Sequence, residues 1–144
     1  MYPKLTVTKH YQPKGVIPAS LMPFKENLEI DEAAYRSHLR ELALVDGISA
    51  ITINGHAAEV HALTLREQER SLELAQDEVG DQIPLIVGIS TPNSMIAAQL
   101  AVTATGGGAS ALLVFPPESM SLGGQQRPEM AIAHFEHIAI STDL

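Results

Sequence analysis

The residues best suited to chemistry lie in one short segment around Gly55. Gly55 lets the chain turn sharply, and the backbone N–H groups of Ala57 and Ala58 can then face an anion such as a carboxylate. His56 is a candidate donor to that carboxylate or a candidate acid/base group. Glu59 is a candidate for orienting the turn. We therefore expect an anion-binding site built from Gly55, His56, Ala57, Ala58 and Glu59.

Two further candidates lie at the ends of other apolar runs. Ser20 is a candidate substrate contact, with a packed serine at a strand end as the alternative. Glu118 is a candidate general base, and with His56 it completes the set of candidate catalytic residues.

Metal binding is less well supported by the spacing of the possible ligands. His56, Glu59 and His61 match no recognised ligand pattern, and the sequence has no HExxH motif. We expect no metal and no other cofactor, with a metal-dependent lyase using His56 and Glu59 kept as an alternative that metal analysis would test. His134 and His137 lie three positions apart in a helical pattern, and we expect them to be exposed to solvent.

Four continuous apolar runs must position these residues. Such runs are typical of strands buried on both faces of a parallel sheet. We predict parallel strands near residues 15–20, 49–54, 84–89 and 111–116, with the candidate residues at their carboxyl ends.

Helical patterns with recognisable starts follow the runs. The predicted starts are Asp31 as an N-cap, Thr64 in a capping box with Glu67, Thr91 as an N-cap before Pro92, and Pro128 after Arg127. The predicted ends lie near Gly47, Gly80 and Gly106. The last helix is predicted to present Ile132, Phe135 and Ala139 on one face.

Composition limits the possible classes of protein. The chain has 144 residues, of which 45% are hydrophobic, which suits a single core. A net charge of −8 argues against a nucleic-acid partner. The absence of cysteine excludes disulfides. No apolar run is long enough to span a membrane, and the first residues do not resemble a signal peptide, so we expect a cytoplasmic protein.

The lysines are confined to the start of the chain. They are Lys4, Lys9, Lys14 and Lys25, and no lysine follows. A lysine that forms a Schiff base needs a desolvated position at a strand end. None of the four is predicted to have one.

The sequence resembles the dihydrodipicolinate synthase/N-acetylneuraminate lyase family of class I aldolases. The resemblance runs from Gly15 to about Leu144 and rests on five segments in register. They are Gly15-Val16-Ile17-Pro18 with Met22-Pro23-Phe24, Ile30-Asp31-Glu32, Gly55-His56-Ala57-Ala58-Glu59 with Leu63-Thr64-Leu65-Arg66-Glu67, Ile83-Pro84-Leu85-Ile86-Val87-Gly88, and Ala109-Ser110-Ala111-Leu112-Leu113-Val114 with Pro116-Pro117.

The resemblance implies an α/β fold of the (β/α)8 TIM-barrel type, of which this chain would form about four βα units. Residues 1–13 would be a leader, and residues 14–144 the N-terminal half of the barrel. It also implies a lyase, aldolase or dehydratase that forms a Schiff base with pyruvate or a related 2-oxo acid. In the family the segment matched by Gly55 to Glu59 holds the substrate carboxylate.

The chain departs from the family pattern. The fifth-strand tyrosine and sixth-strand lysine of the family fall beyond Leu144, so we expect this chain to be inactive alone. His56 and Ala57 replace two threonines, which argues against dihydrodipicolinate synthesis itself, and Glu118 stands where an aromatic residue is usual. The expected partners are a small 2-oxo acid and further copies of the chain, with no nucleic acid and no membrane. The alternative is a non-catalytic half barrel that binds anions or serves as a subunit of an assembly.

Overall fold

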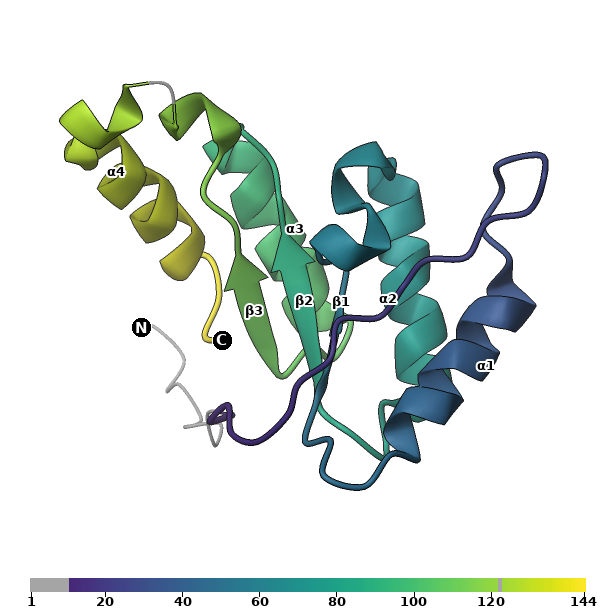
Figure 1. The fold of residues 1–144 in the computed structure, drawn as a ribbon. Helices are drawn as coiled ribbons and strands as arrows, with labels where there is room; N and C mark the ends of the chain where they lie inside the picture. The colour runs from purple at the N-terminus through teal and green to yellow at the C-terminus, as the bar shows by residue number, and fades with distance from the viewer. Residues whose placement is uncertain (1–10, 122) are drawn as a thin grey trace.

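Three of the four apolar runs form a parallel sheet in the computed structural model, which describes residues 11–121 and 123–144. The strands are β1 (Ile51–Ile53), β2 (Leu85–Ile89) and β3 (Ala111–Val114), in the order β1-β2-β3 (Figure 1). Ile51 lies opposite Leu85, and Val87 lies opposite Leu112. The predicted parallel arrangement is therefore confirmed for these three strands.

The first expected strand, residues 15–20, is not a strand in the structure. This segment lies beside β1 through two isolated parallel bridges, Val16 with Ile48 and Ala19 with Thr52. Pro18 lies between the bridges. Its carbonyl accepts a hydrogen bond of 2.8 Å from the Thr52 amide, but proline has no N–H to donate in return. The segment thus occupies the place of a strand while its hydrogen-bond ladder is interrupted.

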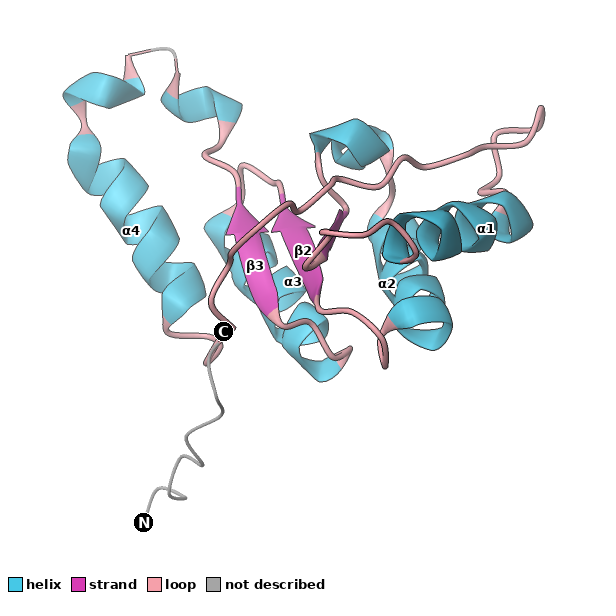
Figure 2. Cartoon of the chain, turned by 60° about the horizontal axis from the view of Figure 1, so that its bottom comes forward, coloured by secondary structure: helices cyan, strands magenta, loops and turns pink. Residues whose placement is uncertain are grey.

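Among the described residues, four α-helices pack around the sheet. Their bounds are α1 (Glu32–Ala43), α2 (Leu65–Val79), α3 (Ser94–Gly106) and α4 (Pro128–Ala139). Four short 3₁₀ helices occupy the loops, namely η1 (His56–Ala58), η2 (Val60–Ala62), η3 (Glu118–Met120) and η4 (Gly124–Gln126). α1 lies beside α2, and α3 lies beside α4 (Figures 1 and 2).

Two of the predicted helix starts are confirmed in atomic detail. The Asp31 carboxylate accepts from the Ala34 amide at 3.0 Å and caps α1. Thr64 and Glu67 form the expected capping box, with the Glu67 carboxylate accepting from the Thr64 amide at 2.7 Å. α2 ends at Val79 with Gly80 as its C-cap, as predicted. Pro128 is likewise the first residue of α4.

The predicted start of α3 is wrong by two residues. Its N-cap is Asn93 and not Thr91, because the Asn93 side chain accepts from two amides, those of Met95 at 2.9 Å and Ile96 at 3.2 Å. The Thr91 hydroxyl accepts from the Asn93 amide instead, at 3.3 Å. Pro92 therefore precedes the helix.

The core lies between the sheet and helices α1, α2 and α3. Side chains at alternate strand positions face the helices, and this set includes the buried residues Ile51, Ile53, Leu85, Val87 and Ile89. The opposite face of the sheet carries Thr52, Ile86, Gly88, Ala111 and Leu113. On that face Ile86 is buried, whereas Leu113 on β3 is 42% exposed.

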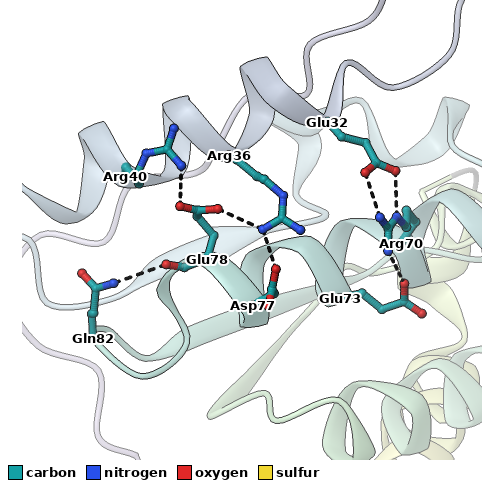
Figure 3. Close-up of polar contacts among 8 residues, drawn as sticks. All are labelled: Glu32, Arg36, Arg40, Arg70, Glu73, Asp77, Glu78 and Gln82. Carbon is teal, nitrogen blue, oxygen red and sulfur yellow. Dashed lines mark hydrogen bonds and ion pairs between the residues drawn. The ribbon is translucent and has the colours of Figure 1, made fainter.

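Ion pairs join α1 to α2 (Figure 3). Arg36 contacts Glu78 at 2.9 Å and Asp77 at 2.6 Å, and Arg40 also contacts Glu78. A second group of ion pairs lies nearer the start of both helices, where Arg70 makes a bidentate pair with Glu32 at 2.8 Å.

The contact between α3 and α4 has no ion pair among the described residues. His134 and Ile138 on α4 are buried against α3, and His134 Nδ1 lies 2.9 Å from Ser94 Oγ. The expectation that His134 is exposed is therefore wrong. The predicted apolar face is instead the open one, with Ile132 55% exposed and Phe135 39% exposed. Ser94 supplies the polar partner that allows the imidazole to be buried.

Two further expectations concern the start of the chain and its relation to a membrane. The expected leader, residues 1–13, lies mostly outside the described residues. Among the described residues, no helix is both long enough and apolar enough to cross a bilayer.

Candidate functional site

The loops that follow the three strands meet at one edge of the sheet. They enclose an open cavity of about 920 Å³. Apolar side chains and polar side chains line it in equal number, and they come from the three loops and from the first turns of α2 and α3. The lining residues that matter below are His56, His61, Gln68, Thr91, Glu118 and Ser119.

The turn after β1 is built from two left-handed residues and two 3₁₀ helices. Asn54 has a φ of 51° and Glu59 a φ of 54°, a region that residues other than glycine rarely adopt. The Ala58 amide donates to the Gly55 carbonyl at 3.1 Å, and the Glu59 amide donates to the His56 carbonyl at 3.0 Å. These bonds close η1 and fix the direction of the amides that precede them.

Two amides of this turn are not used by the residues that the structure describes. In the part of the chain that the structure describes, no hydrogen bond engages the N–H of His56 or Ala57. The sequence predicted Ala57 and Ala58 as the amides that face an anion. The structure places the Ala58 amide inside the turn, which leaves the adjacent amides of His56 and Ala57 for a ligand. His56 lines the cavity, whereas Ala57 is exposed outside its lining.

His56 is exposed and is held by an aromatic contact. Its ring stacks on Phe115, with centroids 4.0 Å apart and planes inclined by 18°. Phe115 directly follows β3, so this contact joins the loop after β1 to the loop after β3 across the end of β2. His61 and Glu118 line the same cavity as His56.

The other predicted residues occupy different places. Gly55 and Ala58 are buried within the turn. Glu59 is exposed at the left-handed junction of η1 and η2, and it does not line the cavity. Ser20 is fully buried beside β1, where its amide donates to the Thr52 carbonyl at 2.8 Å, and it too lies outside the cavity lining.

Sequence reasoning missed two residues of the site, Gln68 and Phe115. Gln68 is 6% exposed and binds the turn through its side chain. A glutamine one helical turn after the N-cap Thr64 points back toward the preceding loop, which was the available signal. Phe115 was recognisable as an aromatic residue at a strand end, immediately before Pro116-Pro117.

The space for the turn is provided by Gly88 on β2. A Cβ atom at this position would lie 2.0 Å from the Asn54 carbonyl oxygen, far inside van der Waals contact. Glycine is therefore required where β2 passes beneath the start of the turn.

The charged groups nearby do not form a metal site. Within residues 11–121 and 123–144, no group of three or more histidines and carboxylates has the arrangement of a metal site. Both described lysines are exposed, and the Lys25 side chain, 52% exposed, lies 3.9 Å from Glu29.

Comparison with known proteins identifies the family of the chain. A model of the Dihydrodipicolinate synthetase family matches residues 12–144, nearly the whole sequence. The chain belongs to this family. Its architecture, parallel strands alternating with helices, is accordingly that of about half of a (β/α)8 barrel.

Individual members of the dihydrodipicolinate synthetase family show the extent of the match. The 4-hydroxy-tetrahydrodipicolinate synthase of Salinibacter ruber is 33% identical over 132 residues, which are 90% of this chain and 41% of that protein. The crystal structure of dihydrodipicolinate synthase from Aquifex aeolicus superposes with a TM-score of 0.77 at 30% identity, covering 90% of this chain and 42% of that one.

The fold is shared more widely than the sequence. N-acetylneuraminate lyase from Fusobacterium nucleatum superposes with a TM-score of 0.77 at 23% identity, covering 90% of this chain and 43% of that one. The chain thus spans about two fifths of the length of the proteins that it matches in the dihydrodipicolinate synthetase family. The described half of the barrel contains the loops after three of its strands.

Proposed function

We propose that this chain supplies the carboxylate-binding part of a lyase that acts on pyruvate or a related 2-oxo acid through a Schiff base. The observation that carries the proposal is the turn after β1, where the amides of His56 and Ala57 have no partner among the described residues. Two adjacent N–H groups are suited to binding a carboxylate.

The roles of the residues follow from this arrangement. The His56 and Ala57 amides bind the substrate carboxylate, and the His56 ring, fixed by its stack on Phe115, forms the adjoining wall. Glu118 lines the cavity and is positioned for proton transfer once substrate is bound. Substitution of the usual threonines by His56 and Ala57 favours a substrate other than that of dihydrodipicolinate synthesis.

The covalent step needs a group that this chain does not provide. Lys25 is the last lysine in the sequence, and it is exposed in a loop. Imine formation needs an amine held in a desolvated pocket, and an exposed lysine in a loop does not meet that requirement. The chain by itself is therefore expected to bind a 2-oxo acid without forming a Schiff base.

Two measurements on the 144-residue chain test the proposal. Titration with pyruvate, followed by amide NMR, should shift the resonances of His56 and Ala57. Reduction with borohydride in the presence of pyruvate should give no covalent adduct by mass spectrometry. Pyruvate that leaves every amide resonance unchanged would refute the carboxylate site, and a stable adduct on Lys14 or Lys25 would refute the assignment of roles.

We also propose that the protein self-associates. No second strand pairs with the outer edge of β3 in the described part of the chain, and Leu113 on that strand is 42% exposed. Nearby α4 exposes Ile132 and Phe135. Unpaired strand edges and apolar helix faces are surfaces that a second chain covers.

Sedimentation equilibrium tests this association. At micromolar concentration we expect a species heavier than the 15.5 kDa of one chain. Phe135→Lys should shift the distribution toward the monomer, whereas a charge at the exposed Leu44 on the other side of the molecule should not. A wild-type chain that sediments as a monomer would contradict the proposal.

A further inference from the structure

The turn after β1 is held in an unfavourable backbone conformation. Both Asn54 and Glu59 have left-handed φ values, although neither is glycine. Such a conformation persists only when the surrounding structure opposes its relaxation. The contacts that oppose it here come from α2 and β2, outside the turn.

Gln68 on α2 provides the first of these contacts. Its side-chain amide donates to the Leu63 carbonyl at 3.2 Å and to the Val60 carbonyl at 3.4 Å. Both carbonyls belong to buried residues of the second half of the turn. Without the amide, two buried carbonyls would lose a donor that water cannot readily replace.

Asn54 provides the second contact, at the other end of the turn. Its side-chain amide donates to the Gln68 carbonyl at 2.9 Å, so that main chain and side chain of one glutamine bind both ends of the turn. Asn54 is 2% exposed, and its main-chain carbonyl oxygen lies so close to Gly88 that a Cβ atom there would be only 2.0 Å away.

We propose that Gln68 and Asn54 are positioning residues, which aim the His56 and Ala57 amides at the carboxylate of the ligand without binding it themselves. This inference rests on the proposed function of the turn and names the residues on which its affinity depends. The side-chain nitrogens of both residues are already engaged by carbonyl groups, so their effect on the ligand is exerted through the backbone between them.

The test compares two glutamines of the same helix. Gln68→Met keeps the length of the side chain and removes its donors, while Gln76→Met makes the same change at an exposed position two helical turns later. Asn54→Gly is measured in parallel, because glycine retains access to the left-handed conformation and removes the contact with Gln68. The probe is pyruvate, titrated into each folded variant and followed by amide NMR.

We expect the Kd for pyruvate to rise about tenfold or more in Gln68→Met and Asn54→Gly, and to stay within about twofold in Gln76→Met. The amide resonances of His56 and Ala57 should also move before pyruvate is added, which a residue that merely touched the ligand would not cause. Kd values and free-state resonances like those of the wild type in both variants would overturn the inference. A wild-type chain that binds no pyruvate would instead refute the proposed function.

Discussion

The two pairs of helices that cover the sheet are joined by different forces. α1 and α2 are joined at the surface by ion pairs, with two arginines of α1 on Glu78 and Arg70 on Glu32 (Figure 3). α3 has no charged side chain. Its contact with α4 combines small residues and the buried Ile138 with two polar contacts, between Ser94 and His134 and between Met95 and His137.

The difference determines what each contact responds to. Exposed ion pairs are screened by salt and contribute little on their own. A buried histidine is sensitive to pH, because burial penalises its protonated form. One contact is therefore expected to respond to ionic strength, and the other to packing and acidity.

The largest effect is expected at the contact between α3 and α4, where no ion pair joins the two helices among the described residues. Ile138→Ala should lower the free energy of unfolding by about 2 to 5 kcal/mol, because Ile138 is 3% exposed and its loss leaves a cavity between α3 and α4. Ile140→Ala at the C-cap of α4 is the matched control, since Ile140 is 81% exposed. Urea denaturation measures both. Equal costs for the two substitutions would show that α4 is not packed on α3 through Ile138.

An intermediate effect is expected from pH. Burial lowers the pKa of His134 below its ordinary 6.5, and the nearby His137 lowers it further. The unfolded chain therefore binds this proton more readily than the folded chain. Stability should be constant with respect to His134 above pH 6.5 and should fall as the pH decreases below that value.

The same measurement separates the two helix pairs. Hydrogen bonds and ion pairs with arginine lower the pKa values of Glu32 and Glu78 from 4.5, so the α1–α2 contact loses stability only at lower pH. His134→Gln should abolish the decline between pH 6.5 and 5 and keep the decline below it. A variant that retains the full decline would place the titrating group elsewhere.

The smallest effect is expected from the ion pairs. Arg36→Gln should lower Tm by about 1 to 4 °C at low salt, since ion pairs near the surface contribute modestly. The difference from the wild type should vanish near about 1 M NaCl, where the Debye length is about 3 Å. Arg66→Gln on α2 is the control, and no dependence on salt is expected of its effect. A loss for Arg36→Gln that persists in high salt would indicate packing by the arginine stem.

The features that were predictable from sequence are those decided within a few residues. The capping box of Thr64 and Glu67 depends on four consecutive residues, and it formed as expected. Asn93 and Thr91 are both residue types that cap helix N-termini. The structure identifies Asn93 as the N-cap, because its side chain accepts hydrogen bonds from two amides of the first turn. The interruption of the first strand follows from Pro18, which has no N–H to donate to β1. The sequence alone does not show which residues of β1 lie opposite Pro18.

The features that were not predictable depend on distant partners. His134 is buried because Ser94, 40 residues earlier, presents a hydroxyl to it. In the candidate site, the segment from Gly55 to Glu59 was identifiable from its residue types. The stack of His56 on Phe115 and the hydrogen bonds of Gln68 to the turn depend on how β1, β3 and α2 are placed relative to one another. The spacing of apolar residues in the sequence does not give that placement.

The confinement of Asn54 also affects how the chain ages. An asparagine followed by glycine is the pair most prone to deamidation, in which the nitrogen of the glycine attacks the side-chain carbonyl carbon and ammonia leaves. Here the Asn54 side chain is buried and donates to the Gln68 carbonyl. While the turn is closed, these contacts oppose the rotation that would bring the side-chain carbonyl carbon to the Gly55 nitrogen. The rate of deamidation at Asn54-Gly55 during storage would therefore measure how often this turn opens.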